Sequence, residues 1–203
     1  RMTRHAAAET KMENLVLAGG VALNCVANGR ILRDGAFKRV WIQPASGDAG
    51  GALGAAMMVW HQLLDNPRRA DGQADGQGGS LLGAAFAADE AREFLTGAGA
   101  VFHTPATEDE LLDEVAAAIE AGKVVGFFHG PMEFGPRAMG NRSILADARN
   151  AKMQSLLNRK IKFRESFRPF APSVLAEQAE RWFDLPEGVE SPYMLLTAPV
   201  RGA

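Results

Sequence analysis

The sequence is poor in cysteine and has no long apolar run, and each of these features excludes some classes of protein. Cys25 is the single cysteine, which excludes an internal disulfide and fits a reducing cytoplasm. No apolar run approaches the ~20 residues that cross a bilayer. The N-terminal stretch carries basic residues without an apolar centre, so it does not resemble a secretory signal. We therefore expect a cytoplasmic protein with no membrane partner.

The remaining composition suits a globular fold of modest size. The chain has 203 residues, of which 47% are hydrophobic, enough for one large domain or two small ones. It opens on Arg1 and runs directly into helix-like sequence, so we expect a piece of a longer protein. Residues 66–79 contain ADGQ twice in tandem and no large apolar residue. This stretch predicts a flexible connector and a domain boundary.

The N-terminal part contains two successive strand–glycine–helix patterns. Residues 14–18 and 39–43 predict short strands, followed by helices over 21–33 and 52–64. Two such units in succession favour an α/β layer structure. Further along, the pattern predicts the following elements: helices at 89–95, 108–121, 151–161 and 176–183, and strands at 101–103, 124–128 and 193–198. Thr107 and Glu110 have the spacing of a capping box.

The two glycine-rich turns are candidate nucleotide contacts. Glycine lets a ligand approach the backbone, and a helix N-terminus offers free N–H groups. The candidate cofactor-binding residues in these turns are Gly19, Gly20, Asn24, Gly47, Gly50 and Gly51. Asp48 fits two interpretations equally, a first-turn carboxylate stabilised by the helix dipole and a metal or phosphate-proximal ligand. Cys25 is better explained as a small buried hydrophobe than as a nucleophile.

Positive charge is concentrated between Lys123 and Phe170. This stretch holds ten Lys/Arg and three Asp/Glu, a net +7, and since the whole chain carries −2 the remainder carries −9. The charges alternate with Gly, Pro, Phe and Ser, which is unlike an ordinary solvated helix face. We therefore predict a compact polyanion, a phosphate above all, as the ligand.

The candidate ligand-binding residues lie in two blocks of this stretch. The first is the loop after the strand at 124–128, in which guanidinium groups and backbone N–H groups can point at one anion. The second is NRKIKFRESFRPFAP, residues 158–172. The candidate catalytic cations are Arg137, Arg142, Lys160, Lys162, Arg164 and Arg168, with Asn141 and Ser143 as hydrogen-bonding neighbours. No nucleophile–base pair is evident.

Four sequence blocks together resemble the O-carbamoyltransferases of the NodU/CmcH type. They are LAGGVALNCVANGRI (17–31), ASGDAGGALGAA (45–56), MEFGPRAMGNRSILADAR (132–149) and NRKIKFRESFRPFAPSVL (158–175). The resemblance implies an α/β protein in which residues 1–65 end an actin/sugar-kinase-like ATPase domain. Residues 66–79 are then the connector. Residues 80–203 form much of a twisted-sheet α/β domain similar to threonylcarbamoyl-adenylate synthase.

The resemblance also implies a two-step reaction. Carbamoyl phosphate and ATP give a carbamoyl-adenylate, and the carbamoyl group then passes to a hydroxyl of a small-molecule or saccharide acceptor. ATP implies Mg²⁺, and the family implies Fe²⁺ or another divalent metal in the complete protein. Asp48 matches the family's downstream carboxylate ligand of that metal, whereas the family's histidine pair belongs upstream of this chain.

The chain departs from the expected family pattern at His129–Gly130–Pro131, where a polar-basic lead-in is expected, and at Met139, where leucine is usual.

Other functions compete with the enzyme. A non-catalytic phosphate- or RNA-binding module would also be basic and aromatic. Related threonylcarbamoylation or hydrogenase-maturation systems are not expected to carry the MEFGPRA-GNRSILAD string. The opposite charges of the two parts favour docking between them or within a homodimer.

Overall fold

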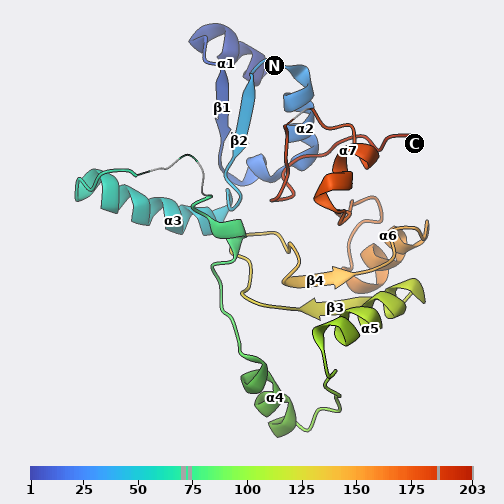
Figure 1. Ribbon diagram of the computed structural model, residues 1–203. Helices are drawn as coiled ribbons and strands as arrows, with labels where there is room; N and C mark the ends of the chain where they lie inside the picture. Colours follow the sequence, from blue (N-terminus) through green and yellow to red (C-terminus); the bar gives the residue numbers. More distant parts are fainter. Residues whose placement is uncertain (70–71, 73–74, 187, 203) are drawn as a thin grey trace. The chain divides into compact units, whose positions relative to one another are not determined.

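The computed structural model describes residues 1–69, 72, 75–186 and 188–202, and its elements are labelled in Figure 1. The strands are β1 (Asn14–Leu17), β2 (Arg39–Ile42), β3 (Val125–Phe128) and β4 (Arg142–Leu145). The α-helices are α1 (Met2–Thr10), α2 (Cys25–Asp34), α3 (Asp48–Met58), α4 (Ala88–Gly97), α5 (Glu108–Glu120), α6 (Met153–Leu156) and α7 (Ala179–Trp182). The other helical turns are η1 (Gly20–Leu23), η2 (Val59–Leu63), η3 (Gly78–Ser80), η4 (Leu157–Ile161) and η5 (Ala176–Gln178). The fold is mixed α/β, as predicted.

The chain divides into two compact units that are not continuous in sequence. Unit 1 comprises residues 1–83, 133–137 and 174–203, and unit 2 comprises 84–132 and 138–173. The chain therefore leaves unit 2 for five residues and then returns to it. The predicted domains at 1–65 and 80–203 stay predictions, and part of the predicted connector at 66–79 lies outside the described residues.

Unit 1 is built around a parallel pair of strands. β1 pairs with β2 in a register that sets Asn14 opposite Arg39 and Leu17 opposite Ile42. Ala22, Ile42 and Leu195 form the buried core beside this pair. Leu195 comes from the C-terminal segment, so the two ends of the sequence share one core. Both strands were predicted from the sequence to within one residue.

The helices that follow these strands differ from prediction at their starts. The predicted helix at 21–33 is interrupted at Asn24, whose Oδ1 accepts a hydrogen bond from the Ala27 N–H at 3.0 Å and so begins α2 afresh. The predicted helix at 52–64 begins four residues earlier, at Asp48, and continues through η2. Gly50 and Gly51, placed in the turn by prediction, lie inside α3.

Unit 2 contains an antiparallel pair, β3 with β4, in which Val125 lies opposite Leu145 and Phe128 opposite Arg142. β4 was not predicted, because its residues were assigned to the loop after β3. At the start of α5 the Thr107 hydroxyl accepts a hydrogen bond from the Glu110 N–H at 3.2 Å. The Glu110 carboxylate accepts a hydrogen bond from the Ala106 N–H at 2.7 Å. In a capping box the donor is the N–H of the N-cap residue, here Thr107, so the observed donor is one residue earlier.

Two predicted strands, at 101–103 and 193–198, are wrong. Val101 is fully exposed, and in the described part of the chain no strand pairs with this segment. In the C-terminal segment, side chains take the backbone acceptors: the Leu195 carbonyl accepts from Asn28 and the Thr197 carbonyl accepts from Arg33. A backbone that is paired with side chains in this way does not form a sheet ladder.

Among the residues that the structure describes, none of the helices combines the length and the apolar character that crossing a lipid bilayer requires.

Candidate functional site

Arg142 holds together the loop that joins β3 to β4. Its guanidinium carbon lies 3.4 Å from the centroid of the Phe128 ring. Nη1 donates to the carbonyls of His129 at 2.9 Å, Gly130 at 3.0 Å and Asn141 at 2.8 Å. Nη2 donates to the Ala84 carbonyl at 3.3 Å. The guanidinium predicted to contact an anion thus already fixes the backbone at both ends of the loop, and its catalytic role stays a prediction.

Asn141 and Ser143 add further bonds within the same loop. Asn141 Nδ2 donates to the Pro131 carbonyl at 2.7 Å, and Ser143 Oγ accepts from the Gly140 N–H at 2.9 Å. Gly140 has a φ of 125°, a conformation that residues with a side chain rarely adopt. These contacts explain why small polar residues and glycine occur here, independently of any ligand.

The second basic block is organised by Asn158, which sequence reasoning did not single out. Asn158 is completely buried in η4. Its Nδ2 donates to the carbonyls of Ser166 at 3.2 Å and Arg168 at 2.8 Å, and its Oδ1 accepts from Arg164 Nε at 2.7 Å. The Arg164 guanidinium carbon also lies 4.8 Å from the Phe170 ring centroid. A buried amide therefore sets the path of the backbone that carries Arg164 and Arg168.

Nearby carboxylates already pair with two cations of the basic stretch. Arg168 Nε donates to Glu165 at 2.9 Å, and Arg149 Nε donates to Asp147 at 2.9 Å. The hydrogen bond from Arg149 lowers the pKa of Asp147. The pKa of Glu165 is lowered by a hydrogen bond to its own backbone N–H and then by Arg168.

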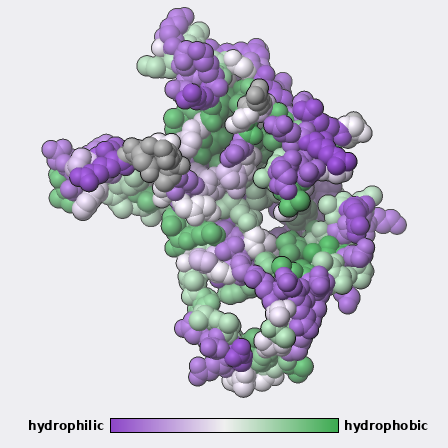
Figure 2. Space-filling model, viewed as in Figure 1, coloured by the Kyte–Doolittle hydropathy of each residue, from purple (hydrophilic) through white to green (hydrophobic). Residues whose placement is uncertain are grey.

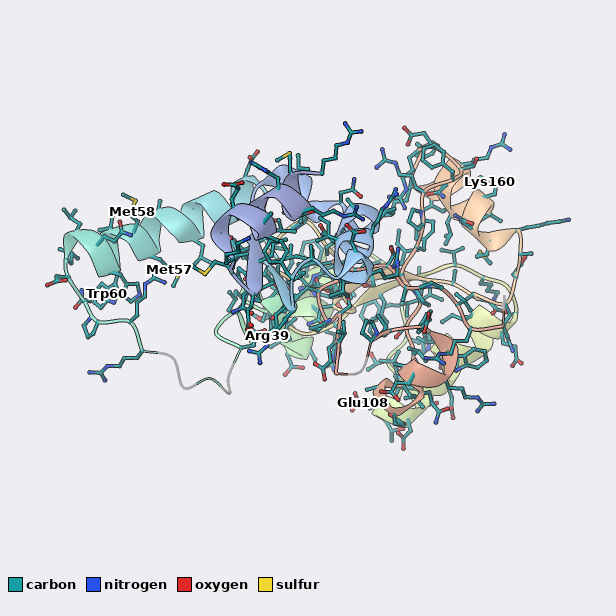
Figure 3. All side chains as sticks on the ribbon, turned by 90° about the horizontal axis from the view of Figure 1, so that it is seen from above. Arg39, Met57, Met58, Trp60, Glu108 and Lys160 are labelled. Atoms are coloured by element: carbon teal, nitrogen blue, oxygen red, sulfur yellow. The ribbon has the colours of Figure 1, made fainter. Side chains whose placement is uncertain are left out.

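The lysines of the second block are exposed. Lys160 lies on η4, where Figure 3 labels it, and Lys162 follows directly after that turn. A hollow of about 540 Å³ lies over α6 and η4 and is lined by Ala151, Lys152, Ser155, Leu156, Arg159 and Lys160. Three cations on its wall suit an anionic ligand.

Arg137 belongs to unit 1, whereas Arg142 belongs to unit 2, although the prediction grouped them. Arg137 Nη2 donates to the Leu23 carbonyl at 2.8 Å. Arg137 Nε is buried without a hydrogen-bond partner. The basic residues predicted to act together thus divide between two compact units.

The candidate glycines fall into two groups. A Cβ at Gly50 would lie 2.1 Å from the Ala45 carbonyl oxygen, so packing already requires glycine there, and its role in binding a cofactor stays a prediction. Gly19, Gly20 and Gly51 are exposed and have open space where a Cβ would be, and Gly47 has the Leu23 side chain nearby. Asn24, also a candidate ligand contact, uses its side-chain oxygen to cap α2.

Asp48 is the first residue of α3 and is exposed. At this position the helix dipole stabilises a carboxylate, which agrees with the interpretation of Asp48 as a first-turn carboxylate. Within the described part of the chain, no group of three or more His, Cys, Asp or Glu residues could hold a metal ion. These residues therefore do not make up a metal site by themselves, and Asp48 as a ligand stays a prediction.

Unit 1 also contains a hollow of about 730 Å³ beside the carboxyl end of β2. Its wall is formed by Val40, Trp41, Ile42, Gln43, Pro44, Leu53, Met57, Asp75, Gly76, Gln77, Leu82, Glu190, Ser191, Pro192, Tyr193, Leu195 and Leu196. The lining is predominantly apolar, with two carboxylates, which is unlike the cationic hollow of unit 2.

Comparison with known proteins agrees with the four sequence blocks. Residues 1–57 match the family described as Carbamoyltransferase N-terminus, and residues 116–203 match Carbamoyltransferase C-terminus. An uncharacterized protein of Synechocystis sp. is 57% identical over 195 residues, which is 95% of this chain and 31% of that protein. Nodulation protein NolNO of Sinorhizobium fredii is 43% identical, over 98% of this chain and 28% of its own length.

A third relative has a named reaction. The 3'-hydroxymethylcephem-O-carbamoyltransferase of Streptomyces clavuligerus is 33% identical over 190 residues, 92% of this chain and 32% of that protein. The chain thus spans about a third of the length of these relatives. The two halves of the family occur in their expected order, and the chain belongs to the carbamoyltransferase family.

Proposed function

We propose that the protein is an O-carbamoyltransferase that activates carbamoyl phosphate with ATP and transfers the carbamoyl group to an acceptor hydroxyl. The observation that carries this proposal is the cationic surface of unit 2, where Lys160 lines an open hollow and a buried Asn158 fixes the neighbouring basic backbone. The Streptomyces relative, named for carbamoylation of a hydroxymethyl group, supports a hydroxyl acceptor.

The activation step explains the concentration of cations. A carbamoyl-adenylate retains one phosphoryl group, so carbamoyl phosphate, ATP and one water must release phosphate and pyrophosphate. Negative charge then develops on several phosphate oxygens, and fixed cations stabilise that charge. Lys160 and Lys162 are suited to this role because both side chains are exposed, and Lys160 lines the hollow together with Arg159 and Lys152. Arg142 positions the backbone of its loop, whereas Arg164 bonds to Asn158 and Arg168 pairs with Glu165.

The remaining parts of the proposal follow the family resemblance. Residues 1–65 belong to an actin/sugar-kinase-like domain and residues 80–203 to a domain like threonylcarbamoyl-adenylate synthase. Mg²⁺ accompanies ATP, and Asp48 supplies one ligand to a second divalent metal, Fe²⁺ or another, whose other ligands lie outside the described residues. The acceptor is a small molecule or a saccharide, and the reaction takes place in the cytoplasm.

Pyrophosphate release by the full-length protein tests this function. With ATP, we expect release only when carbamoyl phosphate is present, and a fall of roughly 10- to 100-fold in Lys160→Ala and Lys162→Ala, because each removes a charge that faces the developing anion. Arg92→Ala, an exposed cation on α4, is the matched control and should retain wild-type release. Release without carbamoyl phosphate, or full release in both lysine variants, would refute the proposal.

Strongly salt-dependent RNA binding would favour the RNA-binding alternative.

A further inference from the structure

The hollow of unit 1 beside the carboxyl end of β2 has the size and the lining of a small-molecule site. Its volume of about 730 Å³ lies within the range of roughly 300–1,000 Å³ that such pockets occupy. Trp41 of β2, Met57 of α3 and Tyr193 of the C-terminal segment all contribute to its predominantly apolar wall. Every lining residue belongs to unit 1, so the hollow lies within one compact unit.

Hydrogen bonds hold the polar side chains of this wall in place. Gln43 Nε2 donates to Gln77 Oε1 at 3.0 Å, and Gln77 Nε2 donates to the Ser80 hydroxyl at 2.6 Å. The Asp75 carboxylate accepts hydrogen bonds from the backbone N–H groups of Gln77 at 2.9 Å and Gly79 at 3.4 Å. The two glutamine amides therefore bond to each other, whereas the Asp75 carboxylate is fixed in position and, because a carboxylate can accept about four hydrogen bonds, can still accept one from a ligand.

The charges and the aromatic groups of the wall favour an organic cation. Asp75 and Glu190 contribute two carboxylates, and none of the described lining residues is Lys, Arg or His. Trp41 is 55% exposed, and the face of an indole ring attracts cations and packs against apolar rings. The Tyr193 hydroxyl accepts from the Gly79 N–H at 3.1 Å and can donate its own proton to a ligand. A phosphate does not suit this wall, because the carboxylates repel it.

We infer that the hollow of unit 1 binds a small organic amine with an apolar ring. The ring packs on Trp41 and Met57, and the ammonium group pairs with the carboxylates of Asp75 and Glu190. This ligand is opposite in charge to the phosphates assigned to unit 2, so the inference goes beyond the proposed function. Two sources share this chemistry: an amine that also carries a hydroxyl, which is the acceptor if the proposed function holds, and an effector that does not react.

Calorimetric titration of the full-length protein with benzylamine, benzyl alcohol and benzoate tests the inference, because these probes share one ring and differ in charge. We expect benzylamine to bind at least about tenfold more tightly than benzoate, since the carboxylates attract the ammonium group and repel the anion. Trp41→Ala should weaken benzylamine binding about fivefold through loss of the ring face. The double variant Asp75→Asn with Glu190→Gln should remove the advantage of benzylamine over benzyl alcohol.

Two matched controls accompany these variants. Trp60 is also 55% exposed but belongs to η2 and does not line the hollow, and Glu9 is an exposed carboxylate of α1. Trp60→Ala and Glu9→Gln should bind benzylamine as the wild type does. The double variant nearly conserves side-chain size, so it keeps the test valid if Trp41→Ala fails to fold.

Three results overturn the inference. The first is equal affinity of the wild type for the three probes, and the second is unchanged benzylamine affinity in both Trp41→Ala and the double variant. The third is that folded wild-type protein does not bind benzylamine, in which case the hollow is filled by protein, from the same chain or from a second copy.

Phenylalaninol, which carries a ring, an amine and a hydroxyl, separates the two sources of the ligand. A carbamoylated product that forms with ATP and carbamoyl phosphate, and is lost in Trp41→Ala, assigns the hollow to the acceptor. Competition with benzylamine without any product assigns it to an effector. If the wild type releases no pyrophosphate but binds benzylamine through Trp41, the proposed function fails and the amine site remains. Normal pyrophosphate release without benzylamine binding overturns this inference alone.

Discussion

Gly50 and Gly54 lie one turn apart in α3 and face very different surroundings. A Cβ at position 50 would lie 2.1 Å from the Ala45 carbonyl oxygen, whereas a Cβ at position 54 would meet no atom within 4 Å. We expect Gly50→Ala to lower the free energy of unfolding by about 1–3 kcal/mol through overpacking. Gly54→Ala should raise it by up to about 1 kcal/mol, because alanine is the better helix former. Chemical denaturation of both variants measures the difference, and equal stabilities would contradict the packing explanation.

Asp147 provides a test of local electrostatics. Its hydrogen bonds from the Arg149 side chain and backbone hold its pKa below the ordinary 3.8. A lowered pKa in the folded state means that the stabilisation is present above about pH 4 and is lost as the pH falls through the folded pKa. NMR titration of the Asp147 carboxyl should show this lowered value, and Arg149→Gln should move it back toward 3.8. The same pKa in both proteins would show that the ion pair is absent in solution.

Individual residues could be assigned a chemical type from the sequence, but not their partners. Arg142 was predicted to contact an anion, which stays a prediction, whereas its acceptors at His129, Gly130 and Asn141 depend on how the loop folds back. Asn158 was missed because an amide at the end of a helical pattern is common. Only the burial of its side chain against the 166–168 backbone distinguishes it.

At the scale of the element, the segment that follows η4 depends on that single buried amide. Asn158→Ala removes two donors to backbone carbonyls and the acceptor for Arg164, so we expect a loss of about 2–4 kcal/mol in unfolding free energy. Hydrogen exchange should increase over residues 162–168. Asn150→Ala removes an exposed amide that only accepts from the Lys152 N–H, and it serves as the control with little expected change. Unaltered exchange over 162–168 in Asn158→Ala would contradict this role.

The elements themselves were predictable where local pattern and local capping agree. β1, β2, β3 and α5 match their predicted positions within one residue, because each is an apolar or amphipathic run ended by glycine or a polar cap. β4 was missed because RSIL is short and its strand form depends on pairing with β3. The sequence of 193–198 predicts a strand, but side chains of α2 donate hydrogen bonds to carbonyls of this segment.

At the scale of the whole molecule, α3 and η2 present an apolar surface to solvent. Met58 is 60% exposed, Trp60 55% and Leu63 75%, and Figure 3 shows Met58 and Trp60 projecting from this helix. Hydrophobic surface is also visible over α3 in Figure 2. Exposed apolar patches of this kind promote association.

We expect the 203-residue polypeptide to self-associate through this surface. Met58→Lys combined with Leu63→Lys should shift sedimentation toward the monomer, whereas Met2→Lys, at a still more exposed methionine of α1, should not. Analytical ultracentrifugation distinguishes these outcomes. A monomeric wild-type chain would contradict the prediction and would also count against the predicted homodimer.

The sequence by itself determined the mixed α/β class, the parallel pair of strand–helix units, the concentration of positive charge and membership of the carbamoyltransferase family. Each of these depends on local periodicity, composition or contiguous motifs. The tertiary structure alone decided that residues 133–137 leave unit 2 and pack against Ala45 and Leu23. It assigned Arg137 to unit 1 and Arg142 to unit 2 and set Arg137 against the Leu23 carbonyl, because contacts between residues far apart in sequence arise only when the chain has folded.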